Sequence, residues 1–306
     1  MKERIWVEDA LKHIHEMEYR HDHPSAESLA GAVGITLHHA GELLDRLDAD
    51  QLITRESGHY LLTDEGRSYA RHVIRAHRLY ETHLAEETGL SAELWHERAE
   101  RAEHRMSDKE LARLAESLGD PRYDPHGDPI PTAEGELPPL MGNALVDYEA
   151  GWEGKIVHIE DEPATVYAQL MAQELAPGMR VRVEHKDREG IGVNVEGRHI
   201  ELTRPAALNV MVWDLDPREE FDESVTRLSS LGSGERVSVV GLTPACRGLE
   251  RRRLLDLGMV PGTVVERDIV APSGNPVAYV VRGATIALRR SQADRVMVRP
   301  VQEEAT

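Results

Sequence analysis

Two histidines and several glutamates share one short segment, "HERAERAEHRMSD", at residues 96–108. At about 3.6 residues per helical turn, one side of a helix would carry four of these groups: His96, Glu100, Glu103 and His104. Imidazole and carboxylate groups gathered on one face are able to bind a divalent cation. Glutamate-rich helices with arginine partners are also typical of solvated surface, so the spacing alone leaves both interpretations open.

The composition favours a soluble globular protein with two or three domains, since 306 residues are many for one core and 40% are hydrophobic. No apolar run approaches the roughly 18 residues of a membrane span. The N-terminus is too charged for a signal peptide, so we expect a cytoplasmic protein without a membrane segment. The single cysteine, Cys246, excludes an intrachain disulfide framework. A net charge of −19 argues against broad nonspecific binding of nucleic acid, but it allows a local DNA-reading surface.

The N-terminal part has the element order of a winged helix. A helix is expected over residues 5–20, and a second helix should begin at the N-cap Ser25 and end at Gly34. A third helix starts within two residues of that glycine, which is the pattern of a helix-turn-helix. Two β-prone runs around Ser57 and Gly58 predict a hairpin, the wing.

A helical region and a connector come next. A long helix should be capped by Thr63 or Asp64 and stop at Gly89, and Ser91 should open the helix that carries the histidines and glutamates. A proline-rich connector over residues 120–141 ends the helical half of the chain.

The second half is rich in β-strand patterns and contains an internal repeat. Residues 175–212 parallel residues 259–298, because each stretch has an apolar residue before Pro-Gly, alternating strands and a final "VMV" strand. The repeat predicts two small β-barrels in tandem, joined by the acidic linker "DLDPREEFDES". Side chains fill barrels of this size, which suits binding or regulatory modules.

The winged helix, the long helix and the following helix together resemble the diphtheria-toxin-repressor family of metal-dependent transcriptional regulators. The similarity covers about residues 5–140, and its most specific strings are "HRL" (77–79), "EHRMSD" (103–108) and "GDPIP" (127–131). The string "RRRLLDLGMVPGT" (251–263) closely resembles the FeoA-type SH3-like domain, and the first repeat looks like a diverged copy of it.

The resemblance implies a multidomain α+β fold with a winged helix-turn-helix, a helical dimerisation domain and two SH3-like barrels. The expected domains are a DNA-binding domain (1–65), a metal-binding and dimerisation domain (66–140), a FeoA-like domain (148–214) and a FeoA-type domain (228–300). The implied function is that of a homodimeric, metal-dependent repressor that binds palindromic operator DNA and controls genes of metal uptake.

Carried over position by position, the family's regulatory metal site falls on Asp9, Glu100, Glu103 and His104. Glu100 and Asp9 stand where the iron-sensing branch has sulfur ligands, and both carboxylates match the manganese-sensing branch. An oxygen-rich site suits Mn²⁺, and Fe²⁺ is the alternative.

A second metal site is implied by His77, Glu81 and His96, which would lie on two crossing helices. In some relatives the connector also contributes ligands, at positions that here are Asp124 and His126. A plain turn is the alternative interpretation of these last two residues.

The third helix would be the recognition helix, beginning near Thr36. We expect side chains of this helix and of the wing to contact bases or phosphates. The candidate DNA-binding residues are Thr36, His38, His39, Glu42, Arg46 and Arg55.

Two other classes of function compete with a repressor. A di-metal oxidase needs two Glu-x-x-His pairs on a helical bundle, and within the helical region, residues 63–118, only Glu93 with His96 has that spacing, so we expect no enzyme. A metal-binding FeoA-like adaptor or buffering protein would need no DNA contact, and it is the alternative that stays open.

Overall fold

The computed structural model describes residues 2–56, 59–216, 219, 221–271 and 274–301. The chain forms two compact units. The first unit comprises Met1–His83, Leu94–Asp124 and Pro129–Pro139, and the second comprises Leu84–Glu93, Pro125–Asp128 and Leu140–Thr306. No helix among the described residues is both long and apolar enough to cross a membrane.

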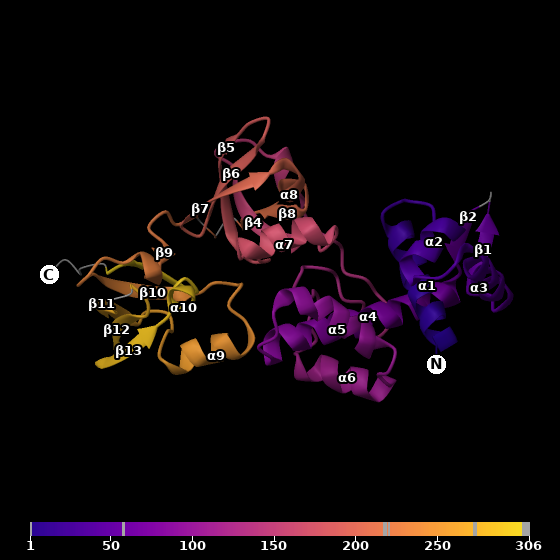
Figure 1. Cartoon of the computed structure of the whole chain (residues 1–306), viewed down its shortest axis with the longest axis horizontal. Helices are drawn as coiled ribbons and strands as arrows, with labels where there is room; N and C mark the ends of the chain where they lie inside the picture. Colours follow the sequence, from indigo (N-terminus) through magenta and orange to yellow (C-terminus); the bar gives the residue numbers. More distant parts are fainter. Residues whose placement is uncertain (1, 57–58, 217–218, 220, 272–273, 302–306) are drawn as a thin grey trace. The chain divides into compact units, whose positions relative to one another are not determined.

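The first unit begins with the predicted winged helix (Figure 1). It consists of helices α1 (Lys2–Tyr19), α2 (Ala26–Val33) and α3 (Leu37–Ala49), followed by strands β1 (Ile53–Glu56) and β2 (His59–Leu62). The two strands pair antiparallel, as expected for a wing. The predicted turn residues Ser57 and Gly58 lie outside the described part of the chain.

Local signals explain where these helices start and stop. Ser25 and Ser28 form a reciprocal capping box at the start of α2, and Gly34 ends the helix in the left-handed conformation with φ of 67°. The side chain of Thr36 then accepts a hydrogen bond from the amide of His39 and caps α3. The short turn between the two helices therefore follows directly from the sequence.

Three further helices follow: α4 (Asp64–Glu87), α5 (Trp95–Glu103) and α6 (Asp108–Ser117). They belong to the first unit except for the last turn of α4, from Leu84 on, which belongs to the second. Thr63 caps α4, because its hydroxyl accepts from the amide of Gly66 at 3.0 Å. The prediction that Ser91 opens α5 is wrong. A short 3-10 helix, Ala92–Leu94, intervenes, and Leu94 precedes α5 without a side-chain cap.

A row of arginines on α4 holds the proline-rich connector. Arg71, Arg75 and Arg78 donate to the backbone carbonyls of Gly135, Pro131 and Pro129 at 2.8, 2.6 and 2.6 Å. The three arginines are four and three positions apart, so they lie on one helix face. The connector therefore follows α4 in the opposite direction, although it has no regular secondary structure of its own over most of its length.

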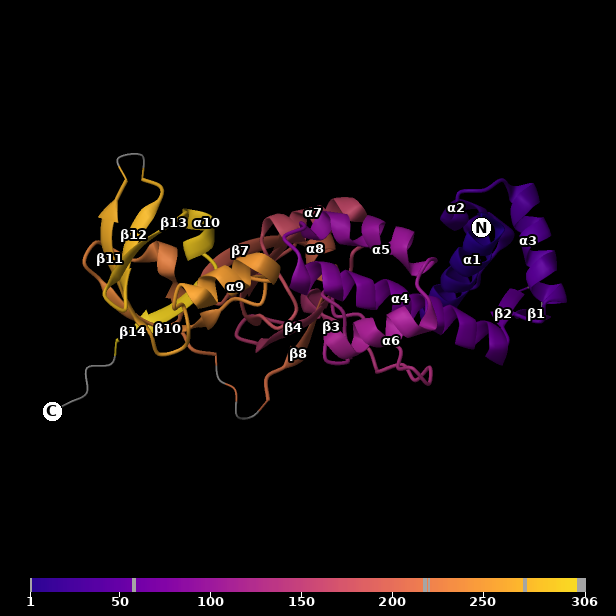
Figure 2. The same ribbon diagram turned by 90° about the horizontal axis from the view of Figure 1, so that it is seen from below.

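The second unit contains two six-stranded sheets with the same topology (Figure 2). In the first sheet the strand order is β3-β8-β4-β5-β6-β7, and in the second, reversed, it is β9-β14-β10-β11-β12-β13. The strands of the first sheet are β3 (Asn143–Ala144), β4 (Glu153–Ile159), β5 (Arg180–Lys186), β6 (Gly190–Val195), β7 (Arg198–Thr203) and β8 (Val210–Asp214). Those of the second are β9 (Thr226–Arg227), β10 (Arg236–Leu242), β11 (Val264–Val270), β12 (Val277–Val281), β13 (Ala284–Leu288) and β14 (Val296–Pro300).

The internal repeat extends to irregular details of the two sheets. The register shifts between Ile156 and His158 in β4, and at the matching place between Val239 and Gly241 in β10. Each sheet also has a helix between its first two long strands: α7 (Ala164–Ala172) lies between β4 and β5, and α9 (Gly248–Asp256) lies between β10 and β11. Shorter helices complete the set: α8 (Arg204–Leu208), α10 (Arg290–Ala293), Leu145–Asp147 and Leu228–Ser230. The expected fold class is confirmed.

Candidate metal centre

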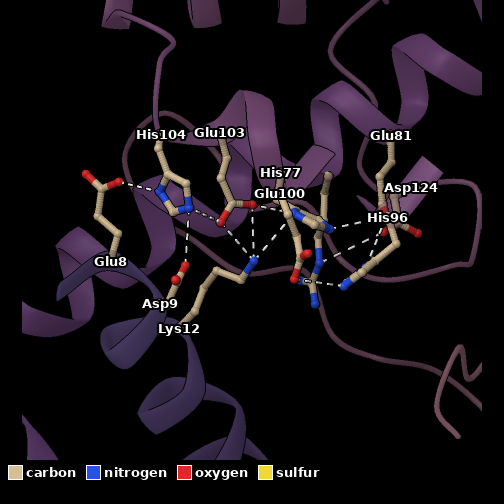
Figure 3. A network of polar contacts seen from close by, with 11 residues as sticks. Glu8, Asp9, Lys12, His77, Glu81, His96, Glu100, Glu103, His104 and Asp124 are labelled. Carbon is tan, nitrogen blue, oxygen red and sulfur yellow. Dashed lines mark hydrogen bonds and ion pairs between the residues drawn. The ribbon is translucent and has the colours of Figure 1, made fainter. Parts of the chain in front are cut away.

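Acidic, imidazole and ammonium groups meet inside the first unit, where α1, α4 and α5 come together (Figure 3). Their side chains form a continuous series of polar contacts. The labelled members are Glu8, Asp9, Lys12, His77, Glu81, His96, Glu100, Glu103, His104 and Asp124.

Asp9, Glu103 and His104 form the first cluster. Each offers one ligand atom, and these atoms all lie within 4.8 Å of one another. His104 Nε2 is 3.2 Å from an oxygen of Asp9 and 3.6 Å from an oxygen of Glu103. Asp9 comes from α1, whereas Glu103 and His104 end α5. The first cluster therefore joins the winged helix to the helix that follows α4.

Glu8 contacts the ring nitrogen of His104 that faces away from the first cluster. It was not predicted as a site residue from the sequence. His104 Nδ1 lies 2.6 Å from Glu8, whose carboxylate also accepts from Tyr69 at 2.8 Å and from Arg4 at 2.6 Å. A carboxylate on the far nitrogen fixes the ring orientation of a ligating histidine. The signal was present, because Glu8 lies three residues before the buried Leu11 and so on the apolar face of α1.

Protonation of His104 is strongly favoured in the metal-free protein. Burial would lower the pKa of His104, but hydrogen bonds from the ring to the carboxylates of Asp9 and Glu8 raise this pKa to about 9. Burial acts in the opposite sense on Glu8, yet hydrogen bonds from His104 and Arg4 lower the pKa of its carboxyl group. A cation bound at His104 Nε2 would therefore compete with a proton.

His77, Glu81 and His96 form the second cluster, and their ligand atoms also lie within 4.8 Å of one another. Glu81 Oε1 is 3.2 Å from His77 Nε2 and 3.5 Å from His96 Nδ1. His77 and Glu81 are buried on α4, while the side chain of His96 is half exposed on α5. A carboxylate oxygen of Asp124 lies within 4.8 Å of a carboxylate oxygen of Glu81.

His126 belongs to the second unit. It is buried there, and its Nε2 lies 2.9 Å from the hydroxyl of Tyr167. Its backbone carbonyl accepts from the amide of Ile159 in β4.

The face predicted for α5 divides into a buried and an exposed part. Glu103 and His104 have side-chain exposures of 0% and 9%. His96 and Glu100 have 50% and 54%, and His96 Nε2 lies 3.3 Å from Glu100. The structure thus brings Asp9, Glu103 and His104 together, and it places Glu100 beside His96.

One carboxylate connects the two clusters. Glu103 hydrogen-bonds His77 Nδ1 through one oxygen, and both of its oxygens accept from the ammonium of Lys12, at 3.0 and 3.1 Å. Burial would raise the pKa of Glu103, but His77 and Lys12 lower it. Burial would likewise lower the pKa of Lys12, whereas the Glu103 carboxylate raises it. Glu103 is thus a buried carboxylate that faces several positive groups.

The donor set suits a hard divalent cation. Both clusters offer only carboxylate oxygens and imidazole nitrogens, and no sulfur ligand. Carboxylates favour ions such as Mn²⁺, and imidazole also suits Fe²⁺. The residues present therefore fit either of these metals.

The candidate recognition helix presents polar side chains to solvent. His38 and Glu42 have side-chain exposures of 81% and 61%, and they lie 3.4 Å apart. His39 is exposed and its ring contacts the hydroxyl of Thr36 at 2.9 Å. These four residues line the first turns of α3.

Arg46 and Arg55, the two candidate phosphate-binding residues, each contact carboxylates of the winged helix. Arg46 lies 3.2 Å from Glu3 and 3.6 Å from Asp50. Arg55, on β1, hydrogen-bonds Asp45 and lies 3.5 Å from Asp48 of α3. A polyanion must therefore compete with these carboxylates for the arginines.

Two domain families match the chain. Residues 63–132 match the family of the iron dependent repressor metal binding and dimerisation domain. Residues 144–213 and 226–300 match the FeoA domain. The two matches to FeoA coincide with the two repeated sheets.

Three proteins are similar to this chain over about two thirds of its length. The diphtheria toxin repressor of Corynebacterium diphtheriae is 29% identical over 216 residues, which are 67% of this chain and 95% of that protein. The iron-dependent repressor IdeR of Mycobacterium tuberculosis is 29% identical over 210 residues, 64% of this chain and 90% of that protein. The solved structure of a manganese-dependent transcriptional repressor in complex with manganese is 32% identical with a TM-score of 0.61, and covers 68% of this chain and 100% of that one.

Proposed function

Because the chain belongs to the diphtheria-toxin-repressor family of metal-dependent transcriptional regulators, we propose that it represses genes of metal uptake when metal is plentiful. In this proposal it is a regulator and not an enzyme. It would act as a homodimer on operator DNA, since residues 63–132 match a dimerisation domain.

The first cluster is the observation that carries this proposal. Asp9 lies on the first helix of the winged helix, while Glu103 and His104 lie on α5. In the metal-free protein the ring of His104 lies between the carboxylates of Asp9 and Glu103, and its raised pKa of about 9 lets a proton supply the positive charge there. A divalent cation would replace this proton and bind the three residues directly. Asp9 and His104 then fix α1 against α5, and with it the position of the DNA-reading helix.

We propose Mn²⁺ as the metal, with Fe²⁺ as the alternative. Asp9 and Glu103 give the first cluster two carboxylates, a hard donor set. His77, Glu81 and His96 would hold a second ion, with Asp124 as a further ligand. Glu100 would complete the first cluster by turning from His96, whereas the part of His126 stays a proposal from the family resemblance. A manganese complex is the form in which one of the similar structures was solved.

DNA reading is assigned to the exposed side of α3 and to the wing. Thr36, His38, His39 and Glu42 would meet base edges in the major groove, and Arg46 with Arg55 would meet phosphates. A homodimer presents two such helices, and fixing their separation to about one DNA turn, roughly 34 Å, would select a palindromic operator.

Fluorescence anisotropy of DNA from upstream of metal-uptake genes tests this function. Metal-stripped protein should bind weakly, and the same protein with Mn²⁺, or with Fe²⁺ under anaerobic conditions, should bind strongly. Replacement of His38, His39 and Arg46 by alanine should abolish DNA binding and leave metal binding intact. DNA affinity that is independent of metal would refute the proposal, and tight metal binding with no DNA binding would favour the FeoA-like adaptor.

A further inference from the structure

Lys12 places a positive charge inside the candidate metal centre. Its ammonium lies 3.0 and 3.1 Å from the two oxygens of Glu103 and 3.4 Å from His77 Nδ1 (Figure 3). The three residues come from α1, α5 and α4. Lys12 thus lies between the two clusters and contacts one member of each.

The carboxylate of Glu103, which Lys12 contacts, is also a candidate ligand of the first cluster. Glu103 supplies a ligand atom together with Asp9 and His104, yet both of its oxygens already accept from Lys12. The side chain of Glu103 has 0% exposure and that of Lys12 has 14%, so water screens this contact poorly. A divalent cation and the ammonium therefore compete for one carboxylate and also repel each other.

We propose that Lys12 is an internal competitor of the metal ion, which occupies Glu103 in the metal-free protein and yields that carboxylate when a divalent cation binds. This inference rests on the metal site of the proposed function and deepens it. Its consequence is that Lys12 weakens metal binding, and so raises the metal concentration at which the protein responds.

A carboxylate on the same helix lies close to the ammonium of Lys12. A buried ammonium without a partner is costly, so displacement needs a new partner for Lys12. Glu16 lies one turn further along α1, and both Glu16 and Glu100 act electrostatically on Lys12. Glu100 is a candidate metal ligand itself, whereas Glu16 is exposed, so the carboxylate of Glu16 can hold the ammonium near solvent.

If Lys12 competes with the metal ion, removal of its charge should strengthen metal binding. If Lys12 instead holds Glu103 in position for the metal, removal of the charge should weaken metal binding. In Lys12→Gln, Glu103 loses the competing ammonium, and Mn²⁺ should bind about tenfold tighter or more, given the repulsion expected between the two cations. Lys12→Arg keeps the positive charge beside Glu103 and should therefore bind Mn²⁺ more weakly than Lys12→Gln. Isothermal titration of the metal-stripped full-length chain with Mn²⁺, in competition with a chelator, measures both. Unchanged or weaker binding by Lys12→Gln would overturn the proposal, because a clamp that preorganises Glu103 would lose affinity when removed.

A second variant tests the same idea at an exposed position, where folding is not at risk. Glu16→Gln removes one alternative partner of the displaced ammonium and should weaken Mn²⁺ binding about threefold, as estimated for one partly exposed ion pair. Glu116→Gln, exposed on α6, is the matched control and should have no effect. Equal affinities of the two variants would contradict the displacement of Lys12.

The Mn²⁺ titrations contain no DNA, so they test the role of Lys12 separately from the repressor function. Mn²⁺ affinity that is insensitive to Lys12 would overturn this inference alone. Mn²⁺ binding that tightens in Lys12→Gln, without metal-dependent DNA binding, would overturn the repressor and leave this inference standing. A chain that binds no Mn²⁺ at all would overturn both.

Discussion

His104 Nδ1 lies 2.6 Å from the carboxylate of Glu8, so a residue of the first helix orients a residue at the end of α5. The other ring nitrogen of His104 faces Asp9 and Glu103. Glu8 and Asp9 are neighbours in sequence, and they contact the two opposite nitrogens of one imidazole. The link between the winged helix and α5 is therefore made twice, once through the candidate ligands and once behind them.

Replacing Glu8 by glutamine should weaken metal binding without removing a ligand. The amide keeps the size of the side chain, but it neither holds a negative charge nor strengthens the basicity of His104. Loss of such an outer carboxylate reduces metal affinity by about 10- to 100-fold. Chelator competition with Mn²⁺ measures the effect, and Tyr69→Phe, which removes only one of the bonds to Glu8, should lose much less. Wild-type affinity in Glu8→Gln would show that His104 is not a ligand oriented in this way.

Neutralising an acidic partner of Arg55 should strengthen DNA binding. Asp45 hydrogen-bonds Arg55 in the free protein and adds negative charge to α3. In Asp45→Asn we expect operator DNA to bind about two- to fivefold tighter, since exposed ion pairs contribute little each. Anisotropy at several salt concentrations measures this change, with Asp256→Asn as the control at an exposed position of the second unit. A loss of affinity in Asp45→Asn would instead make Asp45 a base-contacting residue.

His15 should make the metal-free protein sensitive to acid. It is 6% exposed on α1, and burial, with Arg71 and Arg78 nearby, lowers its pKa from 6.5 to about 4. A lowered pKa means that the folded state favours neutral His15. Its contribution is fully present above pH 6.5 and is lost as the pH falls through about 4.

Between pH 6.5 and 4, protonation linked to His15 should lower the free energy of unfolding by roughly 2 to 3 kcal/mol. His15→Gln removes this titration, so its stability should fall less between pH 6.5 and 4 than that of the wild type. Urea denaturation followed by circular dichroism across this range is the measurement. His199→Gln, at an exposed position of β7, is the control and should follow the wild type. Parallel pH curves for His15→Gln and the wild type would contradict the burial of a neutral imidazole.

Much of the fold follows from local sequence signals. Ser25 and Gly34 define α2 because capping and the left-handed conformation depend on residues close in sequence. The repeat similarly predicts two like sheets, since each repeat carries its own turns and alternating strands. Ser91 failed as a cap because Ala92–Leu94 form a 3-10 turn, which changes where the first turn of α5 begins.

The spacing of residues in the sequence predicted only part of the candidate site. Glu103 and His104 were placed on the correct helix, but their contacts with α1 join residues that are more than 90 positions apart. Helical periodicity cannot show that Lys12 reaches Glu103, because this depends on how α1 packs against α5. It also treats Glu100 as equivalent to Glu103, although the first is half exposed and the second is buried.

The central claim is that metal binding at the first cluster and DNA binding at α3 are one coupled equilibrium. Linkage requires operator DNA to tighten Mn²⁺ binding by the same factor by which Mn²⁺ tightens DNA binding. The decisive measurement is the Mn²⁺ dissociation constant of the full-length protein, by chelator competition, with and without saturating operator DNA. We predict a decrease of at least tenfold with DNA, and a smaller decrease in Asp9→Asn, which loses the link from α1 to α5 through the candidate ligands and keeps the one through Glu8. An Mn²⁺ affinity that DNA leaves unchanged in the wild type would contradict the account.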